Sequence, residues 1–172
     1  MPLLLQNILV LGLSGLTAAA TSFGSFSGLG EIHTVWSEGD HSDLGCLTST
    51  GLWTADLTRC DLFEVDRHAS DNTVLLNLTS AAGSCFITNN GRFRCGLKGN
   101  KPPGKALDFG VYDKNLGYPI PGLEVLRLGM YGLMASDGKN PPDVNDEPQE
   151  LHFVSFIEKG KYVWLAFVEP KI

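Results

Sequence analysis

The sequence predicts an all-β domain, either a small antiparallel β-sandwich or a closed barrel, stapled by two disulfides. Short runs of β-branched and aromatic residues recur along the 172 residues, and glycines, prolines and other turn residues separate them. No stretch has the pattern of an amphipathic helix of ordinary length. The chain also contains four cysteines. Closing or doubling the sheet is how such a chain hides its apolar face and its strand edges.

Residues 1–20 have the pattern of a secretory signal peptide. They carry no charged side chain, are largely apolar from Leu3 onward, and end in three alanines at 18–20. Gln6 and Asn7 interrupt the apolar run, which disfavours a permanent membrane span. We therefore expect a secreted, extracellular protein with no membrane attachment after cleavage.

The composition changes after the predicted cleavage site. Residues 21–30 are mostly Ser, Gly and Phe, and this low-complexity pattern predicts a flexible leader. Residues 31–172 then form the predicted domain, which is long enough for one substantial core. The formal charge of −6 gives no net attraction for phosphate backbones, so it disfavours nucleic acid as a partner.

Strand patterns follow one another along the predicted domain. The first group has turn signals at all-β spacing and covers 33–37, 46–53, 60–65, 73–79, 84–88 and 92–96. A basic, Pro-rich loop at 98–105 precedes further candidates at 106–112, 123–128 and 130–135. The two strongest candidates, 151–158 and 161–169, flank Lys159-Gly160 and predict a C-terminal hairpin.

The four cysteines are Cys46, Cys60, Cys85 and Cys95. In a secreted chain they predict two disulfides, and their spacing lacks the tight Cys-x-x-Cys pairs of a zinc site. Of three possible connectivities we favour the two local ones, Cys46 with Cys60 and Cys85 with Cys95. The second pair brackets the hairpin-turn signal at 89–91, which would bring its sulfurs together.

Four segments around the cysteines carry an ordered set of landmarks. They read Gly45-Cys46-Leu47-x-Ser49-x-Gly51-x-Trp53, Cys60-x-x-Phe63, Leu78-x-Ser80-x-x-Gly83-x-Cys85 and Gly91-x-Phe93-x-Cys95-Gly96. In this order they resemble the C-terminal domain of fungal ribonuclease T2 enzymes. The resemblance implies an extracellular accessory module, with attachment to carbohydrate or cell wall as a plausible role.

The resemblance also implies that the chain is no enzyme. In the enzymes a separate catalytic domain carries two histidine segments, the first reading His-Gly-Leu-Trp-Pro. The echo at 50–54 has Thr50 in place of that histidine, so it offers no acid or base to act on a ribose hydroxyl. We therefore expect an accessory domain standing alone, with no catalytic residues and no cofactor.

The titratable side chains give no competing site. His33, His41, His68 and His152 are scattered, and although a turn after Glu38 could bring the first two together, we expect exposed or hydrogen-bonded histidines and no metal centre. The acidic loop 137–150 does not have the spacing of an EF-hand, so we favour a solvated loop over a calcium site.

Two weaker kinds of surface site remain. Trp36, Tyr112 and Tyr118 lie near turn positions and are candidate sugar-binding rings, whereas Trp53 and Trp164 are expected in the core. The basic patch contains Lys98, Lys101 and Lys105 with Arg92 and Arg94 nearby. We expect it to be a solvated rim, with Phe93 packed inward and not stacked on RNA bases.

Asn77 begins an Asn-Leu-Thr acceptor for N-glycosylation. Taken together, the patterns predict a secreted, non-catalytic accessory or binding domain whose candidate partners are cell-wall polysaccharide or an extracellular protein. The alternatives are an effector-like protein-interaction module and an RNA-associated accessory protein or cryptic hydrolase.

Overall fold

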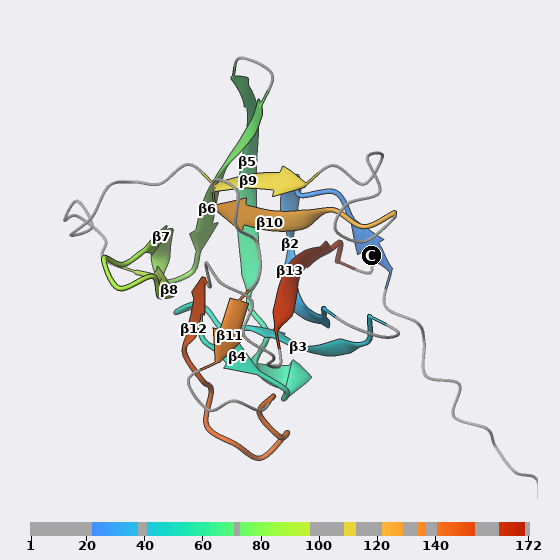
Figure 1. Ribbon diagram of the computed structural model, residues 1–172, viewed down its shortest axis with the longest axis vertical. Coiled ribbons are helices and arrows are strands. Elements are labelled where there is room, and N and C mark those ends of the chain that lie inside the picture. Colours follow the sequence, from blue (N-terminus) through green and yellow to red (C-terminus); the bar gives the residue numbers. More distant parts are fainter. Residues whose placement is uncertain are drawn as a thin grey trace, which may run out of the picture.

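A computed structural model describes residues 22–37, 41–70, 73–96, 109–112, 122–128, 134–136, 141–153 and 162–170. In this part of the chain the strands are β1 Phe23–Gly24, β2 Gly28–Trp36, β3 Asp43–Leu47, β4 Trp53–Thr54, β5 Leu62–Ser70, β6 Thr73–Ser80, β7 Gly83–Ile87, β8 Phe93–Cys95, β9 Phe109–Tyr112, β10 Val125–Leu128, β11 Met134–Ser136, β12 Leu151–Phe153 and β13 Val163–Val168 (Figure 1).

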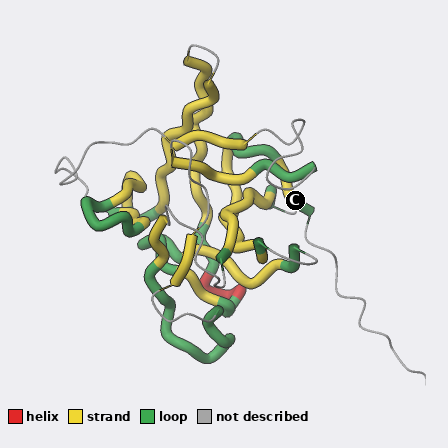
Figure 2. The backbone as a smooth tube through the Cα atoms, in the orientation of Figure 1, coloured by secondary structure: helices red, strands yellow, loops and turns green. Residues whose placement is uncertain are grey.

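One short helical turn, η1 at Leu57–Arg59, accompanies these strands in the described residues (Figure 2). The predicted all-β class is therefore confirmed. A search of the described residues found no helix with the length and hydropathy needed to cross a bilayer. The predicted signal peptide, residues 1–20, lies outside the described residues and stays a prediction.

The strand pairings follow one another almost around a ring, but the link between β10 and β13 has few paired residues. β2 pairs with β5, β5 with β6, β6 with β9, β9 with β10, β10 with β13, and β13 with β2. Among the described residues, the link from β10 to β13 consists of Val125 opposite Ala166. The sheet is therefore not closed into a barrel by a continuous ladder.

Strand β13 runs through the interior, and all six of its residues are buried. Alternate side chains face two hydrophobic clusters, because successive residues of a strand point to opposite sides. Val163, Leu165 and Phe167 belong to the larger cluster, whereas Trp164 and Ala166 belong to the smaller one. The core thus lies on both faces of one strand.

The edges of β13 explain why the predicted C-terminal hairpin is wrong. β2 occupies one edge along all six residues, and β1, β10 and β11 share the other. β12 pairs instead with β11, so β11 lies between β12 and β13, the two strands that the sequence pattern predicted to pair with each other. The predicted turn at Lys159-Gly160 lies outside the described residues.

The structure also corrects the predicted leader. Residues 22–30 are part of the fold, since Phe23–Gly24 pairs with β13 and β2 begins at Gly28. Phe26 is fully buried, and its ring centroid lies 5.5 Å from that of Phe167. The high content of serine and glycine led to the prediction of a flexible leader, but the phenylalanine side chains of this segment pack in the core.

A buried carboxylate fastens the same segment. Glu124 is 4% exposed and accepts a hydrogen bond from the Phe26 N–H at 2.8 Å. The Arg67 guanidinium lies 2.9 Å from both carboxylate oxygens of Glu124. Because a buried carboxylate is costly without partners, these contacts hold the N-terminal segment against β5 and β10.

The two disulfides join the predicted partners. Cys46–Cys60 connects β3 to the residue after η1, and Cys85–Cys95 connects directly opposed residues of β7 and β8. The turn between β7 and β8 is closed by the Thr88 N–H, which donates to the Arg92 carbonyl at 2.9 Å. Both local pairings favoured by the sequence are confirmed.

Removing the first disulfide should destabilise the domain. Its cysteines are separated by 14 residues, and closing a loop of that size stabilises a fold by about 3 kcal/mol by restricting the unfolded chain. We expect the variant Cys46→Ala/Cys60→Ala to lose about that much free energy of unfolding, measured by urea denaturation of the oxidised proteins.

Cys85→Ser/Cys95→Ser should likewise lose protease resistance, and unchanged denaturation midpoints for both variants would contradict the claim.

Gly30 tests whether the N-terminal segment is part of the fold. A Cβ at this position would lie 2.3 Å from the Phe167 ring and 2.6 Å from the Val168 carbonyl oxygen. We expect Gly30→Ala to lower the free energy of unfolding by about 1–3 kcal/mol through overpacking, measured by thermal and urea denaturation. Ser27→Ala, at an exposed position in the same segment, is the matched control. Equal stability of the two variants would contradict the packing of Gly30 and would support the prediction of a flexible leader.

Candidate functional site

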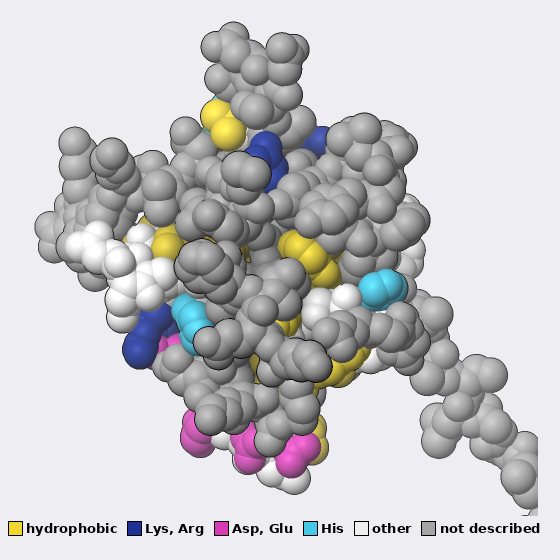
Figure 3. All heavy atoms as spheres, viewed as in Figure 1, with side chains coloured by type: hydrophobic (Ala, Val, Ile, Leu, Met, Phe, Trp, Pro, Cys, Tyr) yellow, Lys and Arg dark blue, Asp and Glu magenta, His cyan; other side chains and the backbone are white. Residues whose placement is uncertain are grey.

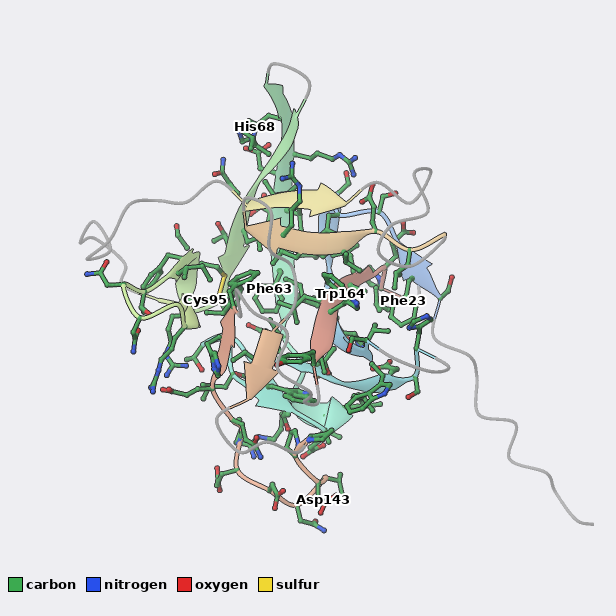
Figure 4. The ribbon with its side chains drawn as sticks, in the orientation of Figure 1. Phe23, Phe63, His68, Cys95, Asp143 and Trp164 are labelled. Carbon is green, nitrogen blue, oxygen red and sulfur yellow. A yellow bond between two sulfur atoms is a disulfide. The ribbon has the colours of Figure 1, made fainter. Side chains whose placement is uncertain are left out.

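A polar cavity of about 410 Å³ lies between three segments of the chain. One wall is the loop after β3, a second is η1 with the residues that follow it, and the third comes from the acidic loop. The lining residues are Thr48, Ser49, Thr50, Leu52, Thr58, Arg59, Cys60, Asp61, Glu147 and Pro148. The acidic loop, which includes Asp143, lies at the opposite end of the molecule from the projecting β5–β6 hairpin (Figure 4).

The first wall is a tight turn held by local hydrogen bonds. The Thr48 N–H donates to the Leu52 carbonyl at 2.8 Å, and the Gly51 N–H donates to the Thr48 carbonyl at the same distance. Gly51 has φ +80°, and a Cβ there would lie 2.8 Å from the Phe93 ring. Glycine therefore meets both the backbone and the packing requirement of this turn.

The second wall is fixed at both ends of η1. Asp56 caps the helical turn by accepting the Thr58 N–H at 3.0 Å and the Thr58 hydroxyl at 2.7 Å. These hydrogen bonds, from the hydroxyl first and then the backbone, lower the pKa of Asp56. Beyond η1, the Cys46–Cys60 disulfide ties the wall to β3. The positions of Arg59 and Asp61 are thus set by the fold.

Charge is unevenly paired in the cavity. The Arg59 guanidinium lies 3.7 Å from the Glu147 carboxylate, and both side chains are solvent-accessible. The Asp61 N–H donates to the Leu47 carbonyl at 3.1 Å, but the buried Asp61 Oδ2 has no hydrogen-bond partner among the described residues. One arginine and two carboxylates leave the lining with one net negative charge.

The cavity offers hydrogen bonding and no acid–base pair of a familiar kind. Four of its side chains are hydroxyls, those of Thr48, Ser49, Thr50 and Thr58. No histidine and no aromatic ring is among its described lining residues. Such a surface can hold a hydroxyl-rich molecule by exchanging hydrogen bonds with it.

The strongest titratable cluster lies in the sheet beside this site. His33 is 5% exposed, and its Nδ1 and Nε2 lie 2.8 Å from Asp43 Oδ2 and Glu31 Oε2 respectively. Asp43 is itself anchored, since its Oδ1 accepts the Gly45 N–H at 3.1 Å. Both ring nitrogens can donate at once only when the imidazole carries its second proton.

The pKa of His33 follows from these contacts. Burial is the largest single influence and disfavours the charged ring, but the hydrogen bonds and negative charges of Asp43 and Glu31 together outweigh it. The pKa of His33 is therefore raised above its ordinary value. The ring holds β2 against β3 and has no free nitrogen to act as a base.

The same cluster comes close to a metal-binding set but lacks the ligands for one. Cys60 Sγ, a His33 nitrogen and a Glu31 oxygen lie within 4.8 Å of one another. Cys60 is in a disulfide, however, and a metal would need its thiolate. The two remaining groups are engaged with each other.

The remaining histidines are not brought to the cavity. The His41 Nδ1–H donates to the Trp36 carbonyl at 3.1 Å. His68 is exposed toward the free end of the β5–β6 hairpin (Figure 4). His152 pairs across an isolated bridge with Arg92. His33 and His41 are thus hydrogen-bonded and His68 is exposed, as expected from the sequence.

The predicted aromatic site is only partly visible. Trp36 is half-buried and packs against the larger core cluster. Tyr112 ends β9, where side chains are outside the described part, and Tyr118 lies outside the described residues altogether. The sugar-binding role of these rings stays a prediction. Trp53 and Trp164 are buried, as predicted, at 1% and 7% exposure.

The predicted basic patch is partly neutralised. Arg92 and Arg94 both form ion pairs with the Glu150 carboxylate, while Lys98, Lys101 and Lys105 lie outside the described residues. Phe93 is fully buried and packs inward, as expected. Asn77 is exposed on β6, where its amide lies 3.5 Å from Asp66, so its side chain is accessible for glycosylation.

The described part of the acidic loop includes a local turn. The Asp143 N–H donates to Asp146 Oδ2 at 2.8 Å, and the Asp146 N–H donates to the Asp143 carbonyl at 2.9 Å. Acidic side chains gather at this end of the molecule in the view of Figure 3. The Asp146 carboxylate thus stabilises the turn in which it lies. Residues 137–140 of the predicted loop are outside the described residues.

Comparison with known families decides the relationship. The family model for the RNase T2-like C-terminal domain matches residues 24–119. The chain belongs to this family. No curated protein and no solved structure gives a significant match.

The matched region of this RNase T2-like C-terminal domain contains all four cysteines and two of the three cavity walls. Glu147 and Pro148 lie beyond it. Sequence reasoning noticed Thr50 only as the replacement of a histidine and missed Arg59 and Asp61, because nothing in their local pattern distinguishes them from other surface residues. Their spacing around Cys60 was the available signal, since a disulfide fixes its neighbours.

The Glu31–His33–Asp43 contacts predict how stability depends on pH. Because the folded-state pKa of His33 is raised, its contribution is complete below the unfolded pKa, about 6.5, and is lost as pH rises through the folded pKa. We expect the parent protein to lose stability relative to His33→Asn from about pH 6.5 upward. Urea unfolding of both proteins across this range measures the difference. A constant difference would contradict the assignment.

Proposed function

We propose that this RNase T2-like C-terminal domain is a secreted, non-catalytic binding module of fungal type that holds cell-wall carbohydrate in the cavity beside η1. The observation that supports this best is the cavity itself, whose hydroxyls, guanidinium and carboxylates suit a hydroxyl-rich ligand. Carbohydrates combine many hydroxyl groups with little charge, and such groups need a surface that both donates and accepts hydrogen bonds.

The absence of catalysis is proposed from the family and from the histidines. The matched family model describes the C-terminal domain of RNase T2-like proteins and not their catalytic segments. Residues 50–54 echo the catalytic His-Gly-Leu-Trp-Pro segment only superficially, and they contain Thr50 where the echo would need a histidine. His33 has both nitrogens occupied by carboxylates. The described cavity lining contains no histidine that could move a proton.

A small polar ligand is favoured over a protein partner. The large hydrophobic side chains exposed among the described residues are Leu29, Leu57, Leu62 and Val144. Leu29 and Leu62 share one face of the β2–β5 ladder, next to the charged Glu31 and Glu64, whereas Val144 belongs to the acidic loop. Protein docking sites usually have a contiguous apolar centre.

A binding experiment tests both halves of the proposal. The purified glycosylated protein is incubated with insoluble chitin, chitosan, β-glucan and cellulose, and RNA cleavage is assayed on the same sample. We expect retention on at least one polymer and no cleavage. Arg59→Ala should weaken retention on the uncharged polymers about tenfold, because it removes a charged hydrogen-bond donor from the cavity.

Glu64→Ala is the control, since Glu64 is an exposed charge on β5 and lines no part of the cavity. Retention that Arg59→Ala leaves unchanged would refute the cavity as the site. RNA cleavage by the parent protein would overturn the non-catalytic proposal, and failure to bind any polymer would overturn the carbohydrate proposal.

A further inference from the structure

We infer that the cavity selects sugars that carry a free amino group over neutral and acidic sugars. The inference rests on the proposed function, since it concerns the ligand class of the same cavity. It is carried by the position and the missing partner of one carboxylate, Asp61.

Asp61 supplies a negative charge that no described residue balances. Arg59, the cation of the cavity lining, is already within 3.7 Å of Glu147. Asp61 has no ion pair with any described residue, and its Oδ2 is buried without a hydrogen-bond donor. Oδ2 itself is enclosed, so what a ligand can balance is the charge of the Asp61 carboxylate, which lines the cavity. A partly buried carboxylate without a counter-ion is costly, so a cationic ligand gains more at this wall than a neutral one.

The position of Asp61 is fixed before any ligand arrives. Its N–H is hydrogen-bonded to the Leu47 carbonyl, and its chain neighbour Cys60 is bonded to Cys46 in β3. The backbone that carries this carboxylate therefore loses little conformational entropy on binding. An ammonium group, which has three donors and a full positive charge, is its natural complement.

The surroundings of the cavity favour the same charge. Glu147 lines the cavity, and Asp143 and Asp146 are exposed nearby in sequence on the acidic loop. The whole chain carries a formal charge of −6. This field attracts cationic ligands and repels uronic acids. The Thr58 hydroxyl donates to Asp56, and those of Thr48 and Thr50 are hydrogen-bonded to each other, so toward a sugar the threonines of the lining act mainly through their remaining acceptor capacity.

The size of the cavity suits a short stretch of sugar. Its volume of about 410 Å³ lies toward the lower end of the range of about 300–1,000 Å³ for small-molecule sites. We therefore expect recognition of one or two residues of a polymer, where a single amino group placed against Asp61 can decide selectivity.

The test compares three soluble tetrasaccharides that differ in charge. Glucosamine, N-acetylglucosamine and galacturonic acid tetramers are titrated by calorimetry into the full glycosylated protein, in mildly acidic buffer that keeps the amine protonated. We expect the glucosamine tetramer to bind about tenfold more tightly than the N-acetylated one, as one charged hydrogen bond would give. The acidic tetramer should bind most weakly.

Asp61→Asn keeps the shape of the side chain and removes its charge. We expect this variant to bind the glucosamine and N-acetylglucosamine tetramers about equally, with melting unchanged, and Glu64→Gln to keep the parent preference. Added salt should reduce the preference in the parent protein, since charge interactions near a surface are screened.

The two levels of the claim fail differently. If neither tetramer binds and the polymers are not retained, the proposed function is wrong. If the tetramers bind but the parent protein shows no preference for the amine, or Asp61→Asn keeps the preference, the proposed function stands and the inference about charge is refuted.

Discussion

The burial of β13 on both faces is the constraint on which the rest of the fold depends. A strand with six buried residues needs apolar cover on two sides and hydrogen-bond partners along two edges. β2 supplies one full edge, while three short strands divide the other. The N-terminal segment belongs to the domain for this reason, because β1 completes an edge and Phe26 covers Phe167.

Buried charges in this protein are of two kinds, and the difference separates structure from candidate function. Glu124 and His33 are both buried, and each has two polar partners. Glu124 is held by the Phe26 N–H and by Arg67 of β5, and His33 by Asp43 of β3 and by Glu31 of its own strand. Such groups fix how the strands lie together, because any other arrangement would leave a charge without a partner. Asp61 is the contrasting case, since its buried oxygen has no donor among the described residues. Of the described residues with an unsatisfied buried polar atom, Asp61 is the one that lines the cavity, so its charge is the one that a ligand there can balance.

Local patterns in the sequence predicted what local physics decides. The strand runs at 73–79, 84–88 and 92–96, the Cys85–Cys95 turn and the inward Phe93 depend on residues close in the chain, and these predictions are confirmed. The run at 46–53 is instead the end of β3, a tight turn and the start of β4. The predicted hairpin of 151–169 is wrong because the pairing partners of β13 depend on burial in the whole domain. The alternation of residue types along one strand carries no information about those partners. The cavity could not be predicted, because Thr50, Asp61 and Glu147 come from three separate segments and meet only when the sheet has formed.

The Cys46–Cys60 disulfide connects stability to the candidate site. Cys46 is fully buried in β3, whereas Cys60 lines the cavity between Arg59 and Asp61. The bond that restricts the unfolded chain therefore also restrains the backbone that carries Arg59 and Asp61. Both cysteines lie in the region that matches the family, but the third wall, with Glu147, lies beyond it. A change confined to the acidic loop can thus alter the charge of the cavity without disturbing the disulfide frame.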